Sequence, residues 1–505
     1  MADYFETETQ LSELKRCVDR HADTLDHPTL PSQESIKAAE ASLPSIQSAS
    51  YLAGAPAEAV VGHITRDILP ALNGQGRSGR YYGFVTGGAL PVSQWADGVV
   101  SHMDQNVQVH LPAQTVATAV EDKALEMLMS LLRLGGGEWP GRTLTTGATG
   151  SNVLGLACGR EAVLARRLGD GAPAVGELGI LGTCVRAGVE EIQVLTSAGH
   201  SSLSKAASVV GLGRQSVKEL RLSDDEPWRL DFAALEEHLK RPRTASIIAI
   251  SAGEVNTGRY GTYGLEEMKR VRALADQYGA WIHVDGAFGI FARVLEANDE
   301  YKLLHERVAG LELADSITVD GHKVLNVPYD CGMFFTRSLS TLQNVFVNPN
   351  AAYLASSSAA TIPSPLNIGL ENSRRFRALP AYAALLSEGR PGFAKLVSNM
   401  VQLSRRLAAF LRDSDHYELL PNADLDEVFI IVLFRAKKPE LNARLVEEIN
   451  QTRQMYVSGT AWKGDKAVRI AVSNWKVDVD RDFKVVTAIL TAVAEGRSFD
   501  IATIE

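Results

Sequence analysis

SITVDGHK, residues 316–323, is an apolar, β-branched run that ends on an acid and is followed at once by a histidine and a lysine. Similar short runs precede it, and helical stretches such as Leu265 to Gln277 separate them. The other runs are IQVLT at 192–196, SIIAIS at 246–251 and WIHVD at 281–285. Strand-like and helical segments that alternate in this way predict an α/β fold with a mostly parallel sheet between about residues 85 and 340.

The overall composition is that of a large folded protein. The chain has 505 residues, 45% of them hydrophobic, which excludes a disordered or fibrous protein and predicts two or three domains at roughly 100–200 residues each. Lys and Arg number 51 against 60 Asp and Glu, a formal net charge of −9 without a long run of like charges. We therefore expect neither nucleic acid nor a membrane as a partner.

The cysteines and the first residues bear on the cellular compartment. The four cysteines, at 17, 158, 184 and 331, are scattered without CxxC spacing, so we expect neither a disulfide framework nor a metal site. MADYFETETQ is acidic and lacks the features of a signal peptide, and no stretch of ~18 apolar residues occurs. We expect a soluble, cytoplasmic protein.

The segments that flank the alternating region have a different character. Residues 8 to about 70 read as helices with polar breaks, in which Val60, Ile64 and Ile68 share one face, and they contain too little core to stand alone. Beyond Arg374 a long helical run precedes further strands and a helix, a pattern typical of a smaller α+β domain. These later segments are VFIIVLF at 428–434, a helix near 441–453 and VRIAVSN at 468–474. We predict an N-terminal helical arm at 1–84, a large domain at 85–375 and a C-terminal small domain at 376–505.

Polar residues just after strand-like runs are the candidates for a functional site, because ligands of open α/β sheets bind at the carboxyl ends of the strands. Lys323 follows the run at 316–320; if it is desolvated, its amine loses a proton readily and can attack an aldehyde, and otherwise it faces solvent. Asp285 ends an apolar strand, where a carboxylate needs a partner such as a protonated pyridine nitrogen, unless it caps the next loop.

Two further candidates lie nearer the N-terminus. TTGATGSN at 145–152 opens a helical stretch from Ser151 to Arg167, and backbone amides there, with Ala148 and Thr149, would hold a phosphate. The alternative is an ordinary helix cap. His200 follows IQVLT, and its flat imidazole could stack on a cofactor ring, although a lone histidine is more often structural.

The order of these four signals, with 323 − 285 = 38 residues between the last two, resembles the fold-type I pyridoxal-phosphate enzymes, and among them the group II amino-acid decarboxylases. The resemblance extends from about Tyr81 to Trp475 and rests on six motifs as a set. They are FVTGGALP (84–91), DQN (104–106), HVDGAFG (283–289), DGHKVLNVPYDCG (320–332), ENSRRFRALP (371–380) and SGTAWKGDKAVRIAVSNW (458–475).

The resemblance implies a cofactor, a sheet and a set of site residues. The cofactor would be pyridoxal 5'-phosphate in a large domain built on a seven-stranded, mostly parallel sheet. Position by position, it implies a Schiff base on Lys323, a pyridine-nitrogen partner in Asp285, ring contacts from His200 and Ala287 on opposite faces, and phosphate contacts from Ala148, Thr149 and His322.

The resemblance also implies a catalytic loop. NPNAAYLASSSAA at 348–360 matches the mobile loop of these decarboxylases, and its Tyr353 matches the tyrosine that protonates Cα after CO₂ has left, which favours simple decarboxylation over oxidation to an aldehyde. Gly286 and Gly321 replace residues that are often alanine. In GEVNTG at 253–258, where many relatives have a threonine facing the cofactor, we favour Asn256 as the hydrogen-bond donor.

The substrate pocket is inferred from the same resemblance. Residues that line the side-chain pocket of aromatic-amino-acid decarboxylases, partly across a dimer interface, match Tyr81, Tyr82, Phe84, Leu111 and Pro112. We expect an aromatic L-amino acid as substrate and a homodimer with its active site at the interface; acidic or aliphatic substrates stay open. Three other functions are also open: an aldehyde synthase or carbon–carbon lyase with the same cofactor, a catalytically silent homologue, and a dinucleotide-dependent oxidoreductase.

Overall fold

A seven-stranded sheet is the centre of the structure, a computed structural model that describes residues 7–20, 28–48, 51–135, 137–169, 171–348 and 362–504. Its strand order is β2-β8-β7-β6-β5-β3-β4, and β8 is antiparallel to both of its neighbours while the other pairs are parallel. The strands are β2 (Gly141–Thr145), β3 (Glu191–Thr196), β4 (Val217–Glu219), β5 (Thr244–Ser251), β6 (Trp281–Asp285), β7 (Ser316–Asp320) and β8 (Gly332–Thr336). The predicted α/β class and the mostly parallel, seven-stranded sheet are confirmed.

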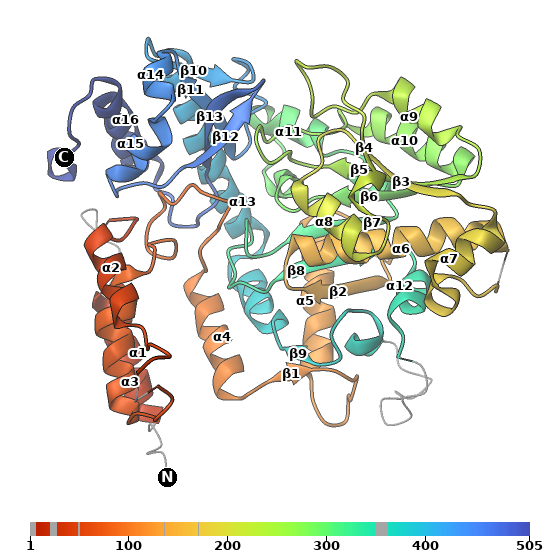
Figure 1. The fold of residues 1–505 in the computed structure, drawn as a ribbon, viewed down its shortest axis with the longest axis horizontal. Helices are drawn as coiled ribbons and strands as arrows, with labels where there is room; N and C mark the ends of the chain where they lie inside the picture. The colour runs from red at the N-terminus through yellow and green to blue at the C-terminus, as the bar shows by residue number, and fades with distance from the viewer. Residues whose placement is uncertain are drawn as a thin grey trace.

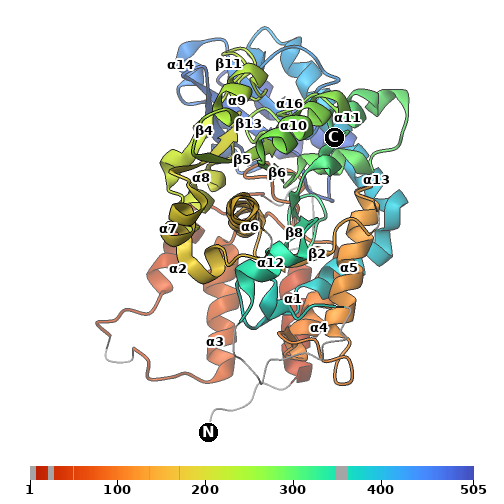
Figure 2. The ribbon, with the colours of Figure 1, turned by 90° about the vertical axis from the view of Figure 1, so that its right-hand side faces the viewer.

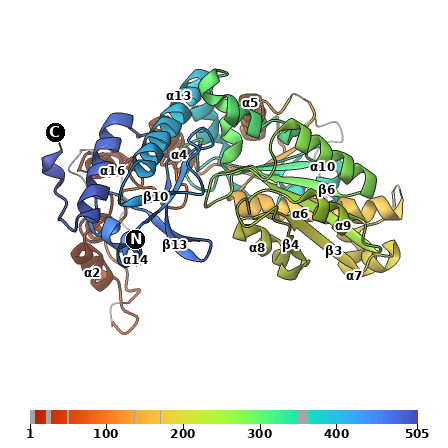
Figure 3. The same cartoon turned by 90° about the horizontal axis from the view of Figure 1, so that it is seen from above.

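Helices cover both faces of this sheet, because alternate strand residues point to opposite sides and both sides are apolar. Val194, Ile247 and Trp281 belong to one apolar cluster, and their chain neighbours Leu195, Ile248 and Ile282 belong to the other. Figure 3 shows the two faces, with α6 and α10 on opposite sides of the strands. One face carries α6 (Ala148–Leu168), α7 (Val175–Ala187), α8 (Ser201–Val209) and α12 (Leu339–Phe346), and the other carries α5 (Ala117–Leu131), α9 (Phe232–Leu239) and α10 (Leu265–Tyr278).

A second, four-stranded sheet lies in the C-terminal part and is antiparallel throughout, in the order β10-β11-β13-β12. The long helix α13 (Ala378–Arg412), kinked at Gly389 where φ is +56°, connects the two parts of the chain. The elements are β10 (Tyr417–Leu420), β11 (Ile431–Ala436), α14 (Pro439–Asn442), α15 (Leu445–Gln451), β12 (Ser458–Trp462), β13 (Asp465–Ala471) and α16 (Val479–Ala494). The strand predicted at 428–434 therefore begins three residues later, and the helix predicted near 441–453 is divided in two.

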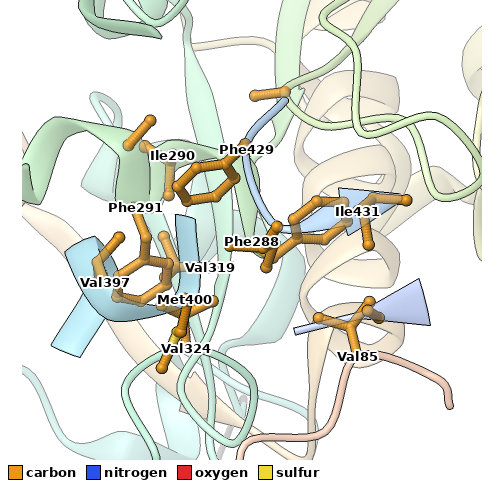
Figure 4. Packing of buried hydrophobic residues seen from close by; sticks show 14 of the residues in the cluster. Val85, Phe288, Ile290, Phe291, Val319, Val324, Val397, Met400, Phe429 and Ile431 are labelled. Atoms are coloured by element: carbon orange, nitrogen blue, oxygen red, sulfur yellow. The ribbon is translucent and has the colours of Figure 1, made fainter. Parts of the chain in front are cut away.

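The two parts share one apolar core. Phe288 and Phe291, from the turn that follows β6, pack in the same cluster as Val397 of α13 and Phe429, which precedes β11. Figure 4 shows these side chains together with Ile431 and Val85. Because all are buried, the turn that follows β6 is held from both sides.

The first helices lie together at one side of the molecule in both views (Figure 1 and Figure 2). They are α1 (Thr7–Arg20), α2 (Gln33–Ser42) and α3 (Ala57–His63), which a π-helical turn at Ile64–Ile68 extends. Leu11, Leu14 and Ile64 are about half exposed, so the described residues leave the apolar faces of the arm uncovered. Between the arm and the sheet lie α4 (Pro91–His102) and the short pair β1 (Asn106–Val107) and β9 (Arg374–Arg375). The remaining α-helix, α11 (Lys302–Arg307), lies between β6 and β7 in the chain.

Within the described residues, no helix is both long and apolar enough to cross a membrane. None of the four cysteines forms a disulfide in the described part of the chain.

Candidate active site

A cavity of about 330 Å³ opens at the carboxyl ends of the central parallel strands. It is bounded by the ends of β5, β6 and β7, by the start of α6 and by the turn that precedes α8. Its lining includes Phe84, Thr146–Gly150, His200, Ser202, Ser251, Gly253–Val255, Asp285, Ala287, Phe288, Asp320, His322 and Lys323. A larger cavity of about 730 Å³ lies at the amino ends of β6 and β7 and contains none of the predicted site residues, so the first cavity is the candidate site.

Lys323 lies in the turn after β7, where the backbone of a second segment approaches it closely. The backbone amide of Gly87 donates to the carbonyl of His322 (3.2 Å), and a Cβ at Gly87 would lie 1.9 Å from the carbonyl oxygen of Lys323. Only glycine fits this contact. The Nζ of Lys323 is 3.8 Å from Oδ2 of Asp320 and its side chain is 18% exposed, so the amine is largely desolvated and faces the cavity.

Asp320 and His322 lie close together, and burial shifts the pKa of each. Oδ2 of Asp320 accepts the amide of Ala148 (3.1 Å), whereas Oδ1 of Asp320 lies 3.0 Å from Nδ1 of His322 without forming a hydrogen bond to it. Burial raises the pKa of Asp320 to about 6, and burial together with the nearby Lys323 ammonium lowers the pKa of His322 to about 4. At neutral pH Asp320 is therefore mostly ionised and His322 neutral, and the close contact between Oδ1 and Nδ1 lacks hydrogen-bond geometry.

Asp285, at the end of β6, is held by two donors. Its Oδ1 accepts a hydrogen bond from the amide of Ala287 (3.2 Å), and its Oδ2 accepts one from Nδ2 of Asn152 (2.9 Å). Asn152 lies in the second turn of α6. The carboxylate lines the cavity and keeps lone pairs for one more donor.

The turn at 145–152 has the geometry expected of an anion site. Helix α6 begins at Ala148, three residues earlier than expected, so the amides of its first turn lie at the cavity wall. Thr149 is exposed to the cavity, and a Cβ at Gly147 would lie 3.0 Å from Cε1 of His322. His322 therefore packs directly against the anion site.

His200 caps the first turn of α8. Its Nδ1 accepts the backbone amide of Ser202 (3.1 Å) and lies 2.8 Å from Oγ of Ser202, so the imidazole proton is on Nε2. Burial lowers the pKa of His200, and the positive charges of Lys323 and Arg469 act in the same direction, against the negative charge of Asp285. The ring is therefore neutral at neutral pH.

The predicted substrate pocket is only partly assembled in this chain. Phe84 lines the cavity, with φ at +62° and 61% of its side chain exposed, and Tyr81 packs on Tyr456 with ring centroids 4.8 Å apart. Tyr82 is completely buried in the main apolar core and does not line this cavity. Leu111 and Pro112 are exposed and do not line the cavity.

The assignment of Asn256 as cofactor donor does not agree with the structure. Its Nδ2 donates to Oε1 of Glu254 (3.0 Å) and its Oδ1 accepts from Thr460 of β12 (2.7 Å), which directs the amide toward the second sheet. Glu254 and Val255 line the cavity instead. Both carboxylate oxygens of Glu254 accept hydrogen bonds from Asn256 and Thr257, so Glu254 stabilises the turn at 254–257.

Tyr353 and the predicted loop at 348–360 lie outside the described residues, apart from Asn348. The site also contains residues to which the sequence assigned no role: Asn152, Ser202, Phe288 and Asp320 line or support it. Of these, Asp320 was detectable as the polar end of a strand, whereas nothing local distinguishes Asn152 from any other helical asparagine. In the described part of the chain, no cluster of His, Cys, Asp or Glu could hold a metal ion.

Comparison with known proteins agrees with this geometry. Residues 65–437 match the family model described as the pyridoxal-dependent decarboxylase conserved domain. L-2,4-diaminobutyrate decarboxylase of Acinetobacter baumannii is 26% identical over 372 residues, which cover 72% of this chain and 68% of that protein. Aromatic-L-amino-acid decarboxylase of Sus scrofa is 24% identical over 374 residues, covering 72% of each chain.

The fold also agrees with a solved structure. The crystal structure of Oryza sativa TDC with PLP and tryptamine superimposes with a TM-score of 0.80 at 20% identity, covering 99% of this chain and 100% of that one.

Proposed function

The chain belongs to the pyridoxal-dependent decarboxylase family, and from this premise we propose that it decarboxylates an aromatic L-amino acid at the cavity around Lys323. The broader statement is established: the protein is a fold-type I enzyme that uses pyridoxal 5'-phosphate to convert an amino acid into an amine and CO₂. The proposal concerns the substrate class, the residues and the assembly.

The residues present fit the cofactor. A phosphate needs several donors in one place, and the first amides of α6 with Thr149 provide them. A pyridine nitrogen needs a carboxylate with a free lone pair, which Asp285 supplies, and an aldehyde needs a desolvated amine, which Lys323 supplies. These three groups line one cavity, and that convergence is the observation that carries the proposal.

When bound, pyridoxal 5'-phosphate supplies an electron sink for the pair released as CO₂ departs. Asp285 would keep the proton on the pyridine nitrogen. Neutral His200 would lie flat against one face of the ring and Ala287 against the other, while Lys323 takes and returns a proton as the substrate amine enters and the product leaves. Tyr353 remains our candidate for the proton donor to Cα.

An aromatic substrate is favoured by the aromatic side chains at the cavity. Phe84 and Phe288 line it, and Tyr456 lies behind Phe84 with ring centroids 6.0 Å apart. Flat apolar walls of this kind gain free energy by contact with an aromatic ring and provide no counter-charge for an acidic side chain.

The test begins with a visible absorption spectrum of the protein with pyridoxal 5'-phosphate. It continues with tyrosine, tryptophan, phenylalanine, glutamate and 2,4-diaminobutyrate as substrates, with CO₂ and amine as products. We expect an aromatic substrate to have the highest kcat/KM, and we expect Phe84→Ala to raise its KM by roughly 10-fold through lost apolar contact. Leu181→Ala is the control, since Leu181 is exposed on α7 and does not line the cavity, and it should have little effect on KM. Preference for glutamate or diaminobutyrate would refute the substrate class, and aldehyde with hydrogen peroxide would identify an aldehyde synthase.

We propose a homodimer as the working assembly, because the arm exposes apolar side chains that need a partner surface. Leu11 and Leu14 on α1 are 51% and 59% exposed, and Val60 and Ile64 on the adjacent helix are 43% and 51% exposed. Light scattering should give twice the mass of the chain, and Leu14→Lys with Ile64→Lys should weaken association. A wild-type monomer that decarboxylates at full rate would exclude the dimeric site.

We also propose a cytoplasmic location. Four cysteines without a disulfide among the described residues are typical of a reducing compartment. Fractionation of the source cells with an antibody to the chain tests this assignment.

A further inference from the structure

Asn152 is a buried amide whose hydrogen-bonding capacity is completely used. Its Nδ2 donates to Oδ2 of Asp285 (2.9 Å) and to Oγ of Ser202 (3.2 Å). Its Oδ1 accepts from Oγ1 of Thr318 (2.9 Å) and lies 3.0 Å from Nε2 of His283. An asparagine amide has two donors and two acceptor lone pairs, so these four contacts satisfy it. The side chain has no exposed surface.

The contact with His283 determines where the proton of that imidazole lies. Because Oδ1 of Asn152 can only accept, Nε2 of His283 carries the hydrogen, and Nδ1 accepts from Oγ of Ser316 (2.8 Å). Ser316 in turn accepts from Nε1 of Trp281 (3.0 Å). Burial lowers the pKa of His283 to about 4, so the ring is neutral. From Trp281 to Asp285, every donor in this chain of hydrogen bonds points toward the carboxylate.

The contact with Ser202 connects this chain of hydrogen bonds to His200. Since Oγ of Ser202 accepts from Asn152, its hydroxyl hydrogen is free to donate to Nδ1 of His200, 2.8 Å away. The amide of Ser202 donates to the same nitrogen. Both donors require His200 to carry its proton on Nε2.

The opposite orientation of the Asn152 amide is excluded by its neighbours. It would place the carbonyl oxygen of Asn152 against a carboxylate oxygen of Asp285, so that two acceptors would meet without a hydrogen between them. Asp285 and His200 are therefore both linked to the one orientation that this amide can adopt.

We propose that Asn152 is a positioning residue for both cofactor-ring contacts at once: it donates to the carboxylate of Asp285 and to the Ser202 hydroxyl that contacts Nδ1 of His200. The inference rests on the proposed roles of Asp285 and His200. It adds that these two roles are coupled through one amide on α6, which touches neither substrate nor cofactor itself.

Two substitutions separate this coupling from a merely structural role. Asn152→Asp keeps the shape but replaces the donor by an acceptor, so two carboxyl groups would meet at Asp285 and one of them must bind a proton. Asn152→Leu keeps the approximate volume and removes all four contacts. We expect either change to raise the dissociation constant for pyridoxal 5'-phosphate by about 10- to 100-fold, the usual result of losing a hydrogen bond to a buried charge.

Gln193 of β3 offers a matched control. It is also a completely buried amide, bonded to the carbonyl of His238 and to Oγ of Ser246 (both 2.9 Å), and it lies away from the cavity. Gln193→Leu should lower stability as Asn152→Leu does but leave cofactor affinity unchanged.

A readout independent of activity is nitrogen NMR of the protein labelled at histidine, with and without cofactor. In the wild type we expect His200 and His283 to show the Nε2–H tautomer from about pH 6 to about pH 8. In Asn152→Leu we expect His283, which loses the acceptor of its Nε2–H, to become a mixture of tautomers. Gln193→Leu should leave His200 and His283 as in the wild type and change only His238, whose Nδ1 lies 3.0 Å from Oε1 of Gln193. Unchanged tautomers and cofactor affinity in both Asn152 variants would overturn the inference. A wild-type chain that binds no pyridoxal 5'-phosphate would instead refute the proposed function.

Discussion

The Asp320→Asn substitution tests the protonation state of the pair behind Lys323. In the wild type, Oδ1 of Asp320 and Nδ1 of His322 are 3.0 Å apart without a hydrogen bond, and burial disfavours the ionised form of Asp320. Asparagine would present an oxygen to the amide of Ala148 and an NH₂ group to His322, and it cannot ionise. The variant therefore mimics the protonated acid at every pH.

The magnitude follows from the pKa of Asp320, which burial raises from its ordinary 3.8 to about 6. Because the folded state binds more protons between these two values, its stability falls as the pH rises through that window and is level above about pH 6. The total fall is about 3 kcal/mol. The Asp320→Asn variant lacks this fall, so its advantage over the wild type should be about 3 kcal/mol larger at pH 7.5 than at pH 3.5, an interval that spans both values.

The assay is urea unfolding of the cofactor-free protein at several pH values and one protein concentration. Parallel curves of unfolding free energy against pH for the two proteins would refute the reasoning, because they would mean that Asp320 ionises normally in the fold. A variant less stable by the same amount at every pH would have the same meaning. His322→Gln is a second variant to compare, since it removes the imidazole beside Asp320.

Three further substitutions test other parts of the site. Lys323→Ala should abolish turnover and the visible absorption band of the bound cofactor. A variant that keeps both would refute the assignment of Lys323 as the residue that forms the Schiff base. Gly87→Ala should destabilise the protein by about 1–3 kcal/mol and weaken cofactor uptake, because its Cβ would meet the carbonyl of Lys323. Gly98→Ala, in open space on α4, should be neutral or stabilising. Equal effects of the two substitutions in thermal melts would contradict the close-approach argument. Glu121→Gln should lower the free energy of unfolding by about 3–5 kcal/mol in urea melts, because it leaves the guanidinium of Arg374 buried beside a neutral group. Glu126→Gln, on the exposed side of α5, should change it by less than about 0.5 kcal/mol.

Local patterns in the sequence were sufficient for the sheet and for the location of the site. The runs at 192–196, 246–251, 281–285 and 316–320 are strands of the central sheet, because β-branched residues at consecutive positions fit a sheet that is covered on both faces. Asp285 and Lys323 follow two neighbouring parallel strands, so their approach to one cavity needs no knowledge of distant contacts. The cofactor and reaction class followed from these motifs together and are confirmed by the family.

The assignments that failed depended on the direction of single side chains. Tyr82 faces the core and Asn256 faces β12, although both are close in sequence to residues that line the cavity. In extended and turn segments, neighbouring side chains point in different directions, and packing against remote elements decides which one faces the ligand. The boundaries of the three predicted domains and the role of Tyr353 stay predictions.

The sequence by itself determined the fold class, the family and the strand ends that carry Asp285 and Lys323, because these depend on residue type and spacing along a single segment. Only the tertiary structure decided the protonation of Asp320 and His322 and the orientation of Asn152. Asn152 and Asp285 are 133 positions apart, and their hydrogen bond exists only because α6 packs across the ends of β6 and β7. Burial there removes water as an alternative partner, so each donor must meet an acceptor of the protein, and such matching is a property of the assembled core.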